Sequence, residues 1–124
     1  ACLDLNVEKL MKDFDTFGLL FESLVERDLR IYMEYLDGEI YHFRDNVTGL
    51  EVDTILEFSN GDYAAVEIKL GFNQVKDAIN NLMKFKKEMI KEPKFMCVIV
   101  GKCNGIMRDD ETGIYVVPIT ALKY

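Results

Sequence analysis

The chain has 124 residues and a net charge of −7; 49% of its residues are hydrophobic and 30% are charged, with 2 Pro and 8 Gly. These values exclude a disordered or low-complexity chain and predict a single domain over residues 1–124. No segment approaches the roughly 20 apolar residues of a membrane span, and the first residues lack the basic and apolar pattern of a secretory signal. The three cysteines (Cys2, Cys97 and Cys103) match neither a zinc site nor a disulfide framework, so we expect a reducing, cytoplasmic environment.

Apolar periodicity and turn residues predict eight elements in the order α-α-β-β-β-α-β-β. Helices are expected at residues 7–14, 17–36 and 74–90, and strands at 39–45, 50–58, 63–70, 94–101 and 113–119. A run of strands joined by hairpins and followed by a helical crossover gives an α/β fold, with a mixed β-sheet flanked by helices.

The two long helices are predicted to be amphipathic. In the helix at 17–36, the apolar residues expected to face the core are Phe17, Leu20, Phe21, Leu24, Leu29 and Tyr32. In the helix at 74–90, the apolar side carries Val75, Ile79, Leu82, Met83 and Ile90, while the other side carries Lys76, Asn80, Lys84, Lys87, Lys91 and also Phe85. This second side is either an ordinary solvated face, which is the commoner case, or a track for a phosphate backbone.

Two strands carry acidic residues in unusual places. Asp53 and Glu67 lie inside the strands at 50–58 and 63–70, where a carboxylate is unfavourable unless it has partners. The strand period of two puts Glu67 and Lys69 on one face. Asp53 and Glu67 on adjacent strands can converge as oxygen ligands for a hard cation, and Glu22 can add a carboxylate from a helix. Without further context, an ion pair on an exposed sheet face explains the same residues.

These residues resemble the PD-(D/E)XK nuclease superfamily, whose pattern is an acid on a leading helix, an Asp in one strand and Glu-x-Lys in the next. Several blocks also resemble a nuclease-like C-terminal domain of unknown function that is found behind predicted AAA+ ATPase modules in bacteria and archaea. The blocks are residues 17–25, 44–45, 49–53, 67–69 and 115–119. The resemblance covers nearly the whole chain and implies a restriction-endonuclease-like three-layer core.

The resemblance also implies a function, a Mg2+- or Mn2+-dependent nuclease-like domain that processes DNA. Asp53, Glu67 and the backbone carbonyl of Ile68 would bind the metal, Lys69 would position the attacking water, and Glu22 would tune the metal or its water shell. The alternative is a catalytically silent module of the same fold that binds its ATPase or another protein. The net charge favours this alternative as far as affinity for nucleic acid is concerned.

The family implies that an ATPase module precedes this domain, which would then be the C-terminal fragment of a longer chain. The missing initiator Met agrees with this expectation. No nucleotide site is expected in the fragment itself, because Cys103 follows Gly101-Lys102 where a P-loop needs Ser or Thr.

The turn between the two acid-bearing strands decides whether they share a site. Directly opposed residues of an antiparallel pair lie on one face, and a one-residue slip reverses every side chain. A two-residue loop at 60–61 would set Asp53 opposite Ile68, and therefore away from Glu67. A three-residue loop would set Asp53 opposite Lys69, with Glu67 diagonal to it. We therefore expect an odd loop or a bulge between Asp53 and Glu67.

Other polar or reactive residues have ordinary structural explanations. A single His42 cannot build a histidine metal cluster and is expected in a strand. Cys97 lies in an apolar run and is expected in the core. The acidic run at 109–111 is followed by Thr-Gly, which predicts a turn rather than a metal cluster. Gln74 is expected at the start of a helix, where its polarity is explained equally well by that position or by a hydrogen bond to a water or a phosphate.

Overall fold

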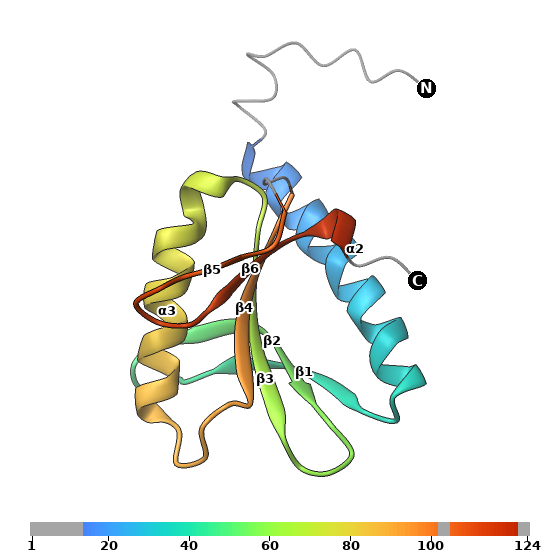
Figure 1. Cartoon of the computed structure of the whole chain (residues 1–124), viewed down its shortest axis with the longest axis vertical. Coiled ribbons are helices and arrows are strands. Elements are labelled where there is room, and N and C mark those ends of the chain that lie inside the picture. Colours follow the sequence, from blue (N-terminus) through green and yellow to red (C-terminus); the bar gives the residue numbers. More distant parts are fainter. Residues whose placement is uncertain (1–13, 102–104, 122–124) are drawn as a thin grey trace.

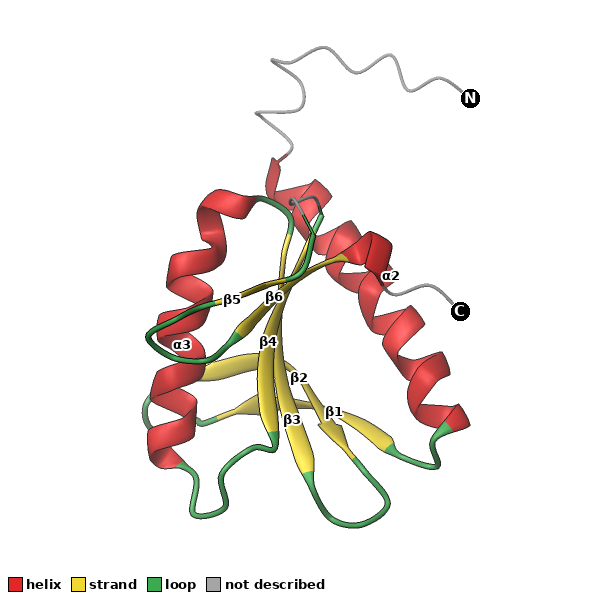
Figure 2. Ribbon diagram, in the orientation of Figure 1, coloured by secondary structure: helices red, strands yellow, loops and turns green. Residues whose placement is uncertain are grey.

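The computed structural model describes residues 14–101 and 105–121 as three layers, a helix, a sheet and a helix (Figure 1, Figure 2). The elements are α2 (Phe14–Tyr35), β1 (Glu39–Arg44), β2 (Glu51–Glu57), β3 (Tyr63–Lys69), η1 (Phe72–Gln74), α3 (Val75–Glu88), β4 (Phe95–Val100), β5 (Met107–Arg108), β6 (Tyr115–Pro118) and η2 (Ile119–Ala121). The predicted helix at 7–14 lies outside the described residues except for Phe14. No helix in the described part has the length and apolar character needed to cross a membrane.

The six strands form one mixed sheet in the order β1-β2-β3-β4-β6-β5. The pairs β1–β2, β2–β3 and β5–β6 are antiparallel, whereas β3–β4 and β4–β6 are parallel. The central strands β3 and β4 have helices over both faces, which explains why their sequences are nearly continuous apolar runs. The predicted α/β class and three-layer arrangement are therefore confirmed, while the two-residue strand β5 was not predicted.

Helix α2 packs through a stripe that shares Phe21 and Leu29 with the predicted one. The stripe that contacts the sheet is spaced by four residues and consists of Phe21, Val25, Leu29 and Met33. Leu20 and Leu24 are 57% and 53% exposed, so the prediction that they face the core is wrong. Both stripes have helical spacing, and the orientation of the helix over β1 and β3 decides which of them is buried.

Helix α3 covers the opposite face of the sheet and closes a second core. Phe85 is fully buried there, and its ring meets Phe43 edge-on at a centroid distance of 4.9 Å and Tyr63 at 6.3 Å. The expectation that Phe85 lies on the polar side is therefore wrong. It lies three residues after the buried Leu82 and shares its face, whereas Ile90, expected on the apolar side, follows the end of the helix and is fully exposed.

The hairpin between β2 and β3 has an odd loop, as predicted, but a longer one than the three-residue form considered above. Glu57 pairs with Tyr63, which leaves the five residues 58–62 in the loop. Gly61 takes a positive φ of 91° and donates its amide to the carbonyl of Phe58 at 2.9 Å. This left-handed conformation suits glycine because it has no Cβ.

Candidate functional site

The candidate site is built around a bulge in β2. Tyr41 of β1 pairs with Ile55 and Phe43 pairs with Val52, so Asp53 and Thr54 together lie opposite the single residue between Tyr41 and Phe43. An extra residue of this kind breaks the regular alternation of a strand and re-aims its side chains. Val52 packs in the core under α3, whereas the hydroxyl of Thr54 bonds Glu26 of α2 at 3.5 Å. The side chains of Val52 and Thr54 therefore point to opposite faces of the sheet, and Asp53 is the residue between them in the chain.

Asp53 points into the plane of the sheet, between β2 and β3. Its Oδ2 accepts a hydrogen bond from the backbone amide of Ile68 at 2.8 Å. The backbone pairs between β2 and β3 extend only as far as Thr54 and Val66. Beyond this point, the carboxylate of Asp53 accepts the hydrogen bond from the backbone of β3. Continuing the register would place Asp53 opposite Glu67, and not opposite Lys69 as the three-residue loop required.

His42 of β1 lies opposite the bulge and supports it. Its Nδ1 is 3.2 Å from the carbonyl oxygen of Asp53, a distance at which the Nδ1–H tautomer donates a hydrogen bond. Sequence reasoning missed His42 as a residue of the site, because the contact depends on the irregular register of β1 against β2.

Glu67 is a buried carboxyl group that faces α3, and only 3% of its surface is exposed. Its Oε1 accepts a hydrogen bond from the side-chain amide of Asn81. Burial raises the pKa of Glu67 well above its ordinary value, and so do a side-chain hydrogen bond and the charge of Asp53; Asn81 and Lys69 act in the opposite sense. The raised pKa favours the protonated form of Glu67 when no cation is present.

Asn81 of α3 joins the two acid-bearing strands. Its side-chain nitrogen donates to the backbone carbonyl of Glu51 in β2 at 2.6 Å and also to Glu67 in β3. Sequence reasoning missed this residue, because an Asn in the middle of a helix is indistinguishable from a solvated one. The available signal was its position: it lies directly before Leu82, at the border of the apolar face.

The acid pair opens to the surface through a hollow of about 360 Å³, which we call the acid hollow. It is lined by Gly49, Glu51, Asp53, Glu67, Lys69, Asp77, Ala78 and Asn81. Asp53, Glu67 and Lys69, which the sequence predicted to lie together, are therefore brought together on the α3 side of the sheet. Asp77 is a further acid that the sequence analysis did not single out.

Glu22 approaches from α2, the helix on the other face. Burial raises the pKa of Glu22, with further increases from Asp53 and Glu26, while Lys69 and His42 lower it. Glu22 is thus within electrostatic reach of Asp53 and Lys69, although it does not line the acid hollow. The gap between β2 and β3 lets groups on both faces act on the same carboxylate.

The donor set fits a hard cation that keeps several water ligands. Within 14–101 and 105–121, no three His, Cys, Asp or Glu side chains form a group that could hold a metal ion. Asp53 and Glu67 nevertheless line the same hollow. In a strand, the N–H and C=O of one residue point to the same neighbour, so the carbonyl of Ile68 points, like its amide, toward Asp53. Two carboxylates, one carbonyl and water are typical Mg2+ ligands.

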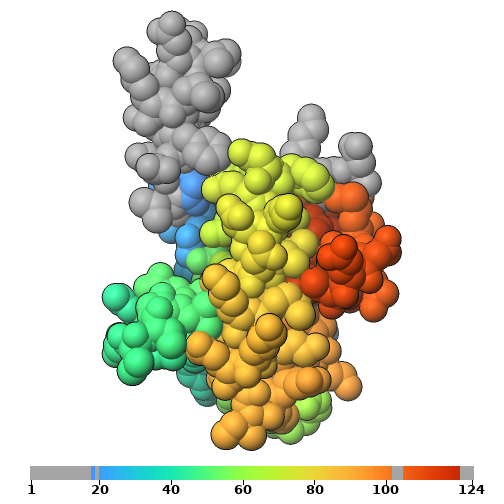
Figure 3. Space-filling model, turned by 90° about the vertical axis from the view of Figure 1, so that its left-hand side faces the viewer, coloured from blue at the N-terminus to red at the C-terminus, as the bar shows by residue number. Residues whose placement is uncertain are grey.

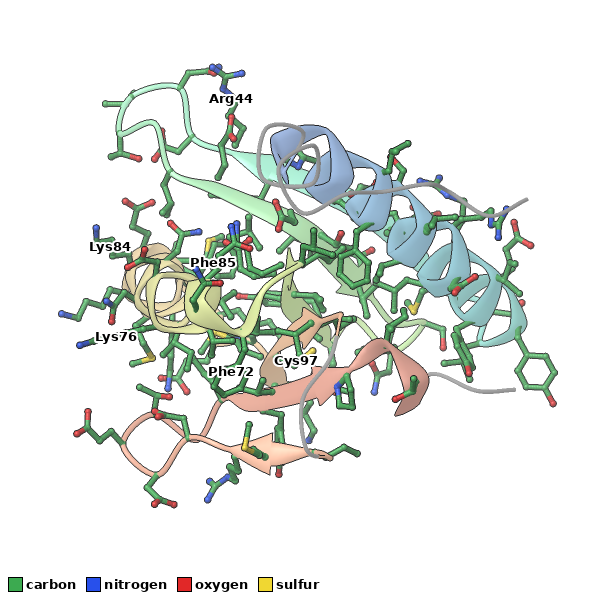
Figure 4. All side chains as sticks on the ribbon, turned by 90° about the horizontal axis from the view of Figure 1, so that it is seen from above. Arg44, Phe72, Lys76, Lys84, Phe85 and Cys97 are labelled. Atoms are coloured by element: carbon green, nitrogen blue, oxygen red, sulfur yellow. The ribbon has the colours of Figure 1, made fainter. Side chains whose placement is uncertain are left out.

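The predicted row of lysines on α3 does not form one continuous track. Lys84 and Lys87 line a hollow beside the β1–β2 hairpin, whereas Lys76 lines another hollow, beside the turn between β5 and β6. Figure 4 shows Lys84 and Lys76 on different sides of α3. Lys91 lies beyond the helix, where it donates to the carbonyl of Gly61 at 2.8 Å and pairs with Asp62 at 3.6 Å.

The remaining sequence assignments have simple outcomes. Cys97 is a free, buried residue of the core, as predicted. In the acidic run at 109–111, Asp109 accepts hydrogen bonds from the amide and the hydroxyl of Thr112, at 3.0 and 2.6 Å, which confirms the predicted turn. Gln74 ends η1, directly before α3, and its Oε1 accepts from the amide of Gly71 at 3.1 Å.

Comparisons with known proteins place the chain as follows. The sequence model of the family described as Domain of unknown function (DUF4143) matches residues 17–122. Among solved structures, a chain from the tetradecameric assembly of Thermococcus gammatolerans McrB AAA+ hexamers with bound McrC is similar, with a TM-score of 0.55 and 14% sequence identity. The match covers 82% of this chain and 27% of that chain, so this likeness concerns the fold alone. A search of curated proteins gave no match.

Proposed function

The chain belongs to the DUF4143 family, and we propose that it is a metal-dependent nuclease-like domain that hydrolyses phosphodiester bonds in DNA. The observation that carries this proposal is that Asp53, Glu67 and Lys69 line one hollow where the backbone pairing of β2 with β3 has ended. A buried carboxyl group beside a second, half-buried one is costly for a fold unless a ligand removes the conflict. A divalent cation does so by neutralising both charges.

Each residue of the site has a distinct part in the proposed chemistry. Asp53, Glu67 and the carbonyl of Ile68 would hold Mg2+ or Mn2+, which would acidify an attacking water and neutralise charge on the scissile phosphate. Lys69 would orient that water and stabilise the charge that develops on phosphate oxygens. Glu22 would hydrogen-bond the surrounding waters from the α2 side. Asn81 would fix the Glu67 carboxylate as a positioning residue.

The setting of this domain is part of the same proposal. The chain would be the C-terminal part of a longer protein with an ATPase module, in agreement with a structural neighbour that comes from an assembly of AAA+ hexamers and matches over 27% of its length. The free, buried Cys97 is compatible with a reducing, cytoplasmic location.

A second function, binding of the ATPase or another protein without catalysis, is favoured by the surface of α2. Leu20, Leu24 and Ile31 follow one another along one side of the helix and are each about half exposed. An exposed apolar row of this kind is typical of a surface that contacts a partner. The two functions differ in one respect: a silent module has no need to bind a divalent ion.

The test uses the whole protein with Mg2+ or Mn2+ and with ATP, incubated with single- and double-stranded DNA, and follows cleavage on denaturing gels. Lys69→Ala is the matched variant, because it leaves both carboxylates in place. We expect wild-type cleavage in the presence of metal and none for Lys69→Ala. Isothermal titration of the 124-residue chain with Mn2+ separates the alternatives, since the nuclease-like site should bind the ion and the absence of binding would favour the silent module.

A further inference from the structure

We propose that a second hollow beside the acid site binds the sugar-phosphate backbone of the nucleic acid strand, next to the bond that is cleaved. This lysine hollow has a volume of about 440 Å³ and lies between the β1–β2 hairpin and the C-terminal half of α3. Its cationic residues are Lys84 and Lys87. The inference rests on the proposed function, because it describes where the nucleic acid strand that enters the acid hollow would continue on the protein surface.

The lysine hollow is continuous with the acid hollow. Gly49 and Asn81 line both of them, Gly49 from the hairpin and Asn81 from α3. Figure 3 shows this side of the molecule, with α3 in yellow and orange beside the green hairpin. A nucleic acid strand that enters the acid hollow next to Asn81 therefore meets Lys84 about one helical turn further along α3.

Lys84 and Lys87 are available to a ligand. Both side chains are exposed, and neither belongs to an ion pair found among the described residues. Glu88 is the single acid that lines the hollow, so its lining keeps a net positive charge. The acid hollow, by contrast, is lined by four carboxylates and one lysine. The charge thus changes sign between the two hollows, as expected where a metal site adjoins a phosphate site.

The β1–β2 hairpin forms one wall of the lysine hollow, and its backbone amides are already used in hydrogen bonds within the hairpin. The amides of Val47 and Thr48 already donate to Asp45, at 2.9 and 3.4 Å, and the amide of Leu50 donates to the hydroxyl of Thr48 at 3.3 Å. With these donors used within the hairpin, the positive charges on α3 remain as the groups that attract an anion. Such a surface recognises phosphates and does not read base sequence.

The spacing along α3 fits a short stretch of backbone. From Asn81 to Lys87 the helix rises about 9 Å, at 1.5 Å per residue. Nucleotides rise about 3.4 Å each along one strand of a duplex, so the hollow spans roughly two to three of them. Two phosphates adjacent to the cleaved bond would therefore lie over Lys84 and Lys87.

The test measures binding of a fluorescent single-stranded DNA oligonucleotide by anisotropy in EDTA, so that cleavage does not interfere. For the double variant Lys84→Gln/Lys87→Gln we expect an affinity about tenfold lower at low salt. The slope of log K against log salt should fall by about 1.4, since each phosphate contact to a single strand contributes about 0.7. The matched control is Lys76→Gln/Lys86→Gln on the same helix, which removes the same charge outside the lysine hollow and should change affinity less than twofold.

The outcomes separate this inference from the proposed function. Equal losses for the two double variants, or no DNA binding by the wild type, would overturn the lysine hollow as a site. If the wild type cleaves DNA and Lys84→Gln/Lys87→Gln cleaves and binds it equally well, the lysine hollow is not a binding site. The proposed function would not be affected by that result. A specific loss of binding in that variant, without metal-dependent cleavage by the wild type, would support the hollow and contradict the nuclease proposal. An RNA oligonucleotide of equal length should give the same change in slope, because both backbones offer the same phosphates.

Discussion

The carboxylate of Asp53 serves as a hydrogen-bond partner for the amide of Ile68, at 2.8 Å, in a position where a neighbouring strand would ordinarily supply a backbone carbonyl. Asp53 thus has a structural role as well as its proposed role as a metal ligand. The two roles separate by substitution, because a side chain can keep the acceptor oxygen without keeping the negative charge.

We expect Asp53→Ala to lower the free energy of unfolding of the metal-free protein by about 1–3 kcal/mol, since it leaves the amide of Ile68 without its partner. Asp53→Asn keeps an acceptor oxygen and removes a charge next to Glu67, so it should unfold at the same urea concentration as wild type or a higher one. Urea titrations in EDTA measure both values. Equal destabilisation by the two substitutions would show that the hydrogen bond to Ile68 is not what matters.

The pH dependence of stability should reveal Glu67. Its pKa in the folded protein is raised, so the folded state holds the proton more tightly than the unfolded chain does. The contribution of Glu67 to the free energy of unfolding is then fully present below its ordinary pKa of 4.5. This contribution is lost as the pH rises toward the higher pKa of the folded state. We expect metal-free wild type to lose stability relative to Glu67→Gln between pH 5 and 8, in urea titrations at each pH. Parallel curves for the two proteins would contradict the raised pKa.

Divalent cations should stabilise the folded protein by mass action. At a concentration about tenfold above the dissociation constant, Mn2+ or Mg2+ would add about 1.4 kcal/mol, which raises the melting temperature by several degrees. Asp53→Asn and Glu67→Gln should not show this increase. Asp110→Asn is the control, because it removes an exposed acid in the turn before β6 and should respond like wild type. A shift of the same size in all four proteins would indicate non-specific ion binding.

Asn81→Asp should convert the acid pair into a cluster of three carboxylates. In EDTA the new charge next to Glu67 lacks a partner, and we expect a loss of about 1–3 kcal/mol. Mn2+ should restore more stability to this variant than it gives to wild type. The neighbouring Asn80→Asp adds the same charge on the exposed side of α3 and should have little effect. If both variants respond to Mn2+ alike, Asn81 does not adjoin the metal position.

Phe85→Ala tests the core under α3. The ring is fully buried and packs edge-on against Phe43 and Tyr63, so its removal should cost about 3–5 kcal/mol of unfolding free energy. Phe72→Ala, which removes an exposed ring just before the same helix, should cost far less. Urea unfolding without metal measures both, and a small loss for Phe85→Ala would contradict the packing described here.

Patterns with a clear period predicted most of the fold. Alternation and turn residues located the strands at 50–58 and 63–70, and the parity argument gave the odd loop between them. That argument took as its premise that Asp53 and Glu67 share a site, which the resemblance to nucleases implied. Its details failed because the number of loop residues depends on where pairing stops, and the sequence does not specify that point.

Features that depend on a third element could not be predicted. The bulge at Asp53 exists only relative to β1, and with it comes the contact from His42. Asn81 has partners in two strands that are far away in sequence. On α2, two apolar stripes compete, and periodicity cannot decide between Leu24 and Val25 as the buried residue. The resemblance to nucleases selected Glu22, Asp53, Glu67 and Lys69; their roles stay predictions.

The parallel pairing of β3 with β4 also has a consequence for how the protein is made. Glu67 lies beside Val98, so about 30 residues separate neighbours in the sheet. At about 5–20 residues per second, a ribosome needs roughly 2–6 s to add them. Until then β3 has an unpaired edge, and Glu67 also waits for α3 to bring Asn81. A nascent chain therefore exposes an apolar strand before it can assemble the acid pair, which makes this interval the time at which aggregation competes most strongly with folding.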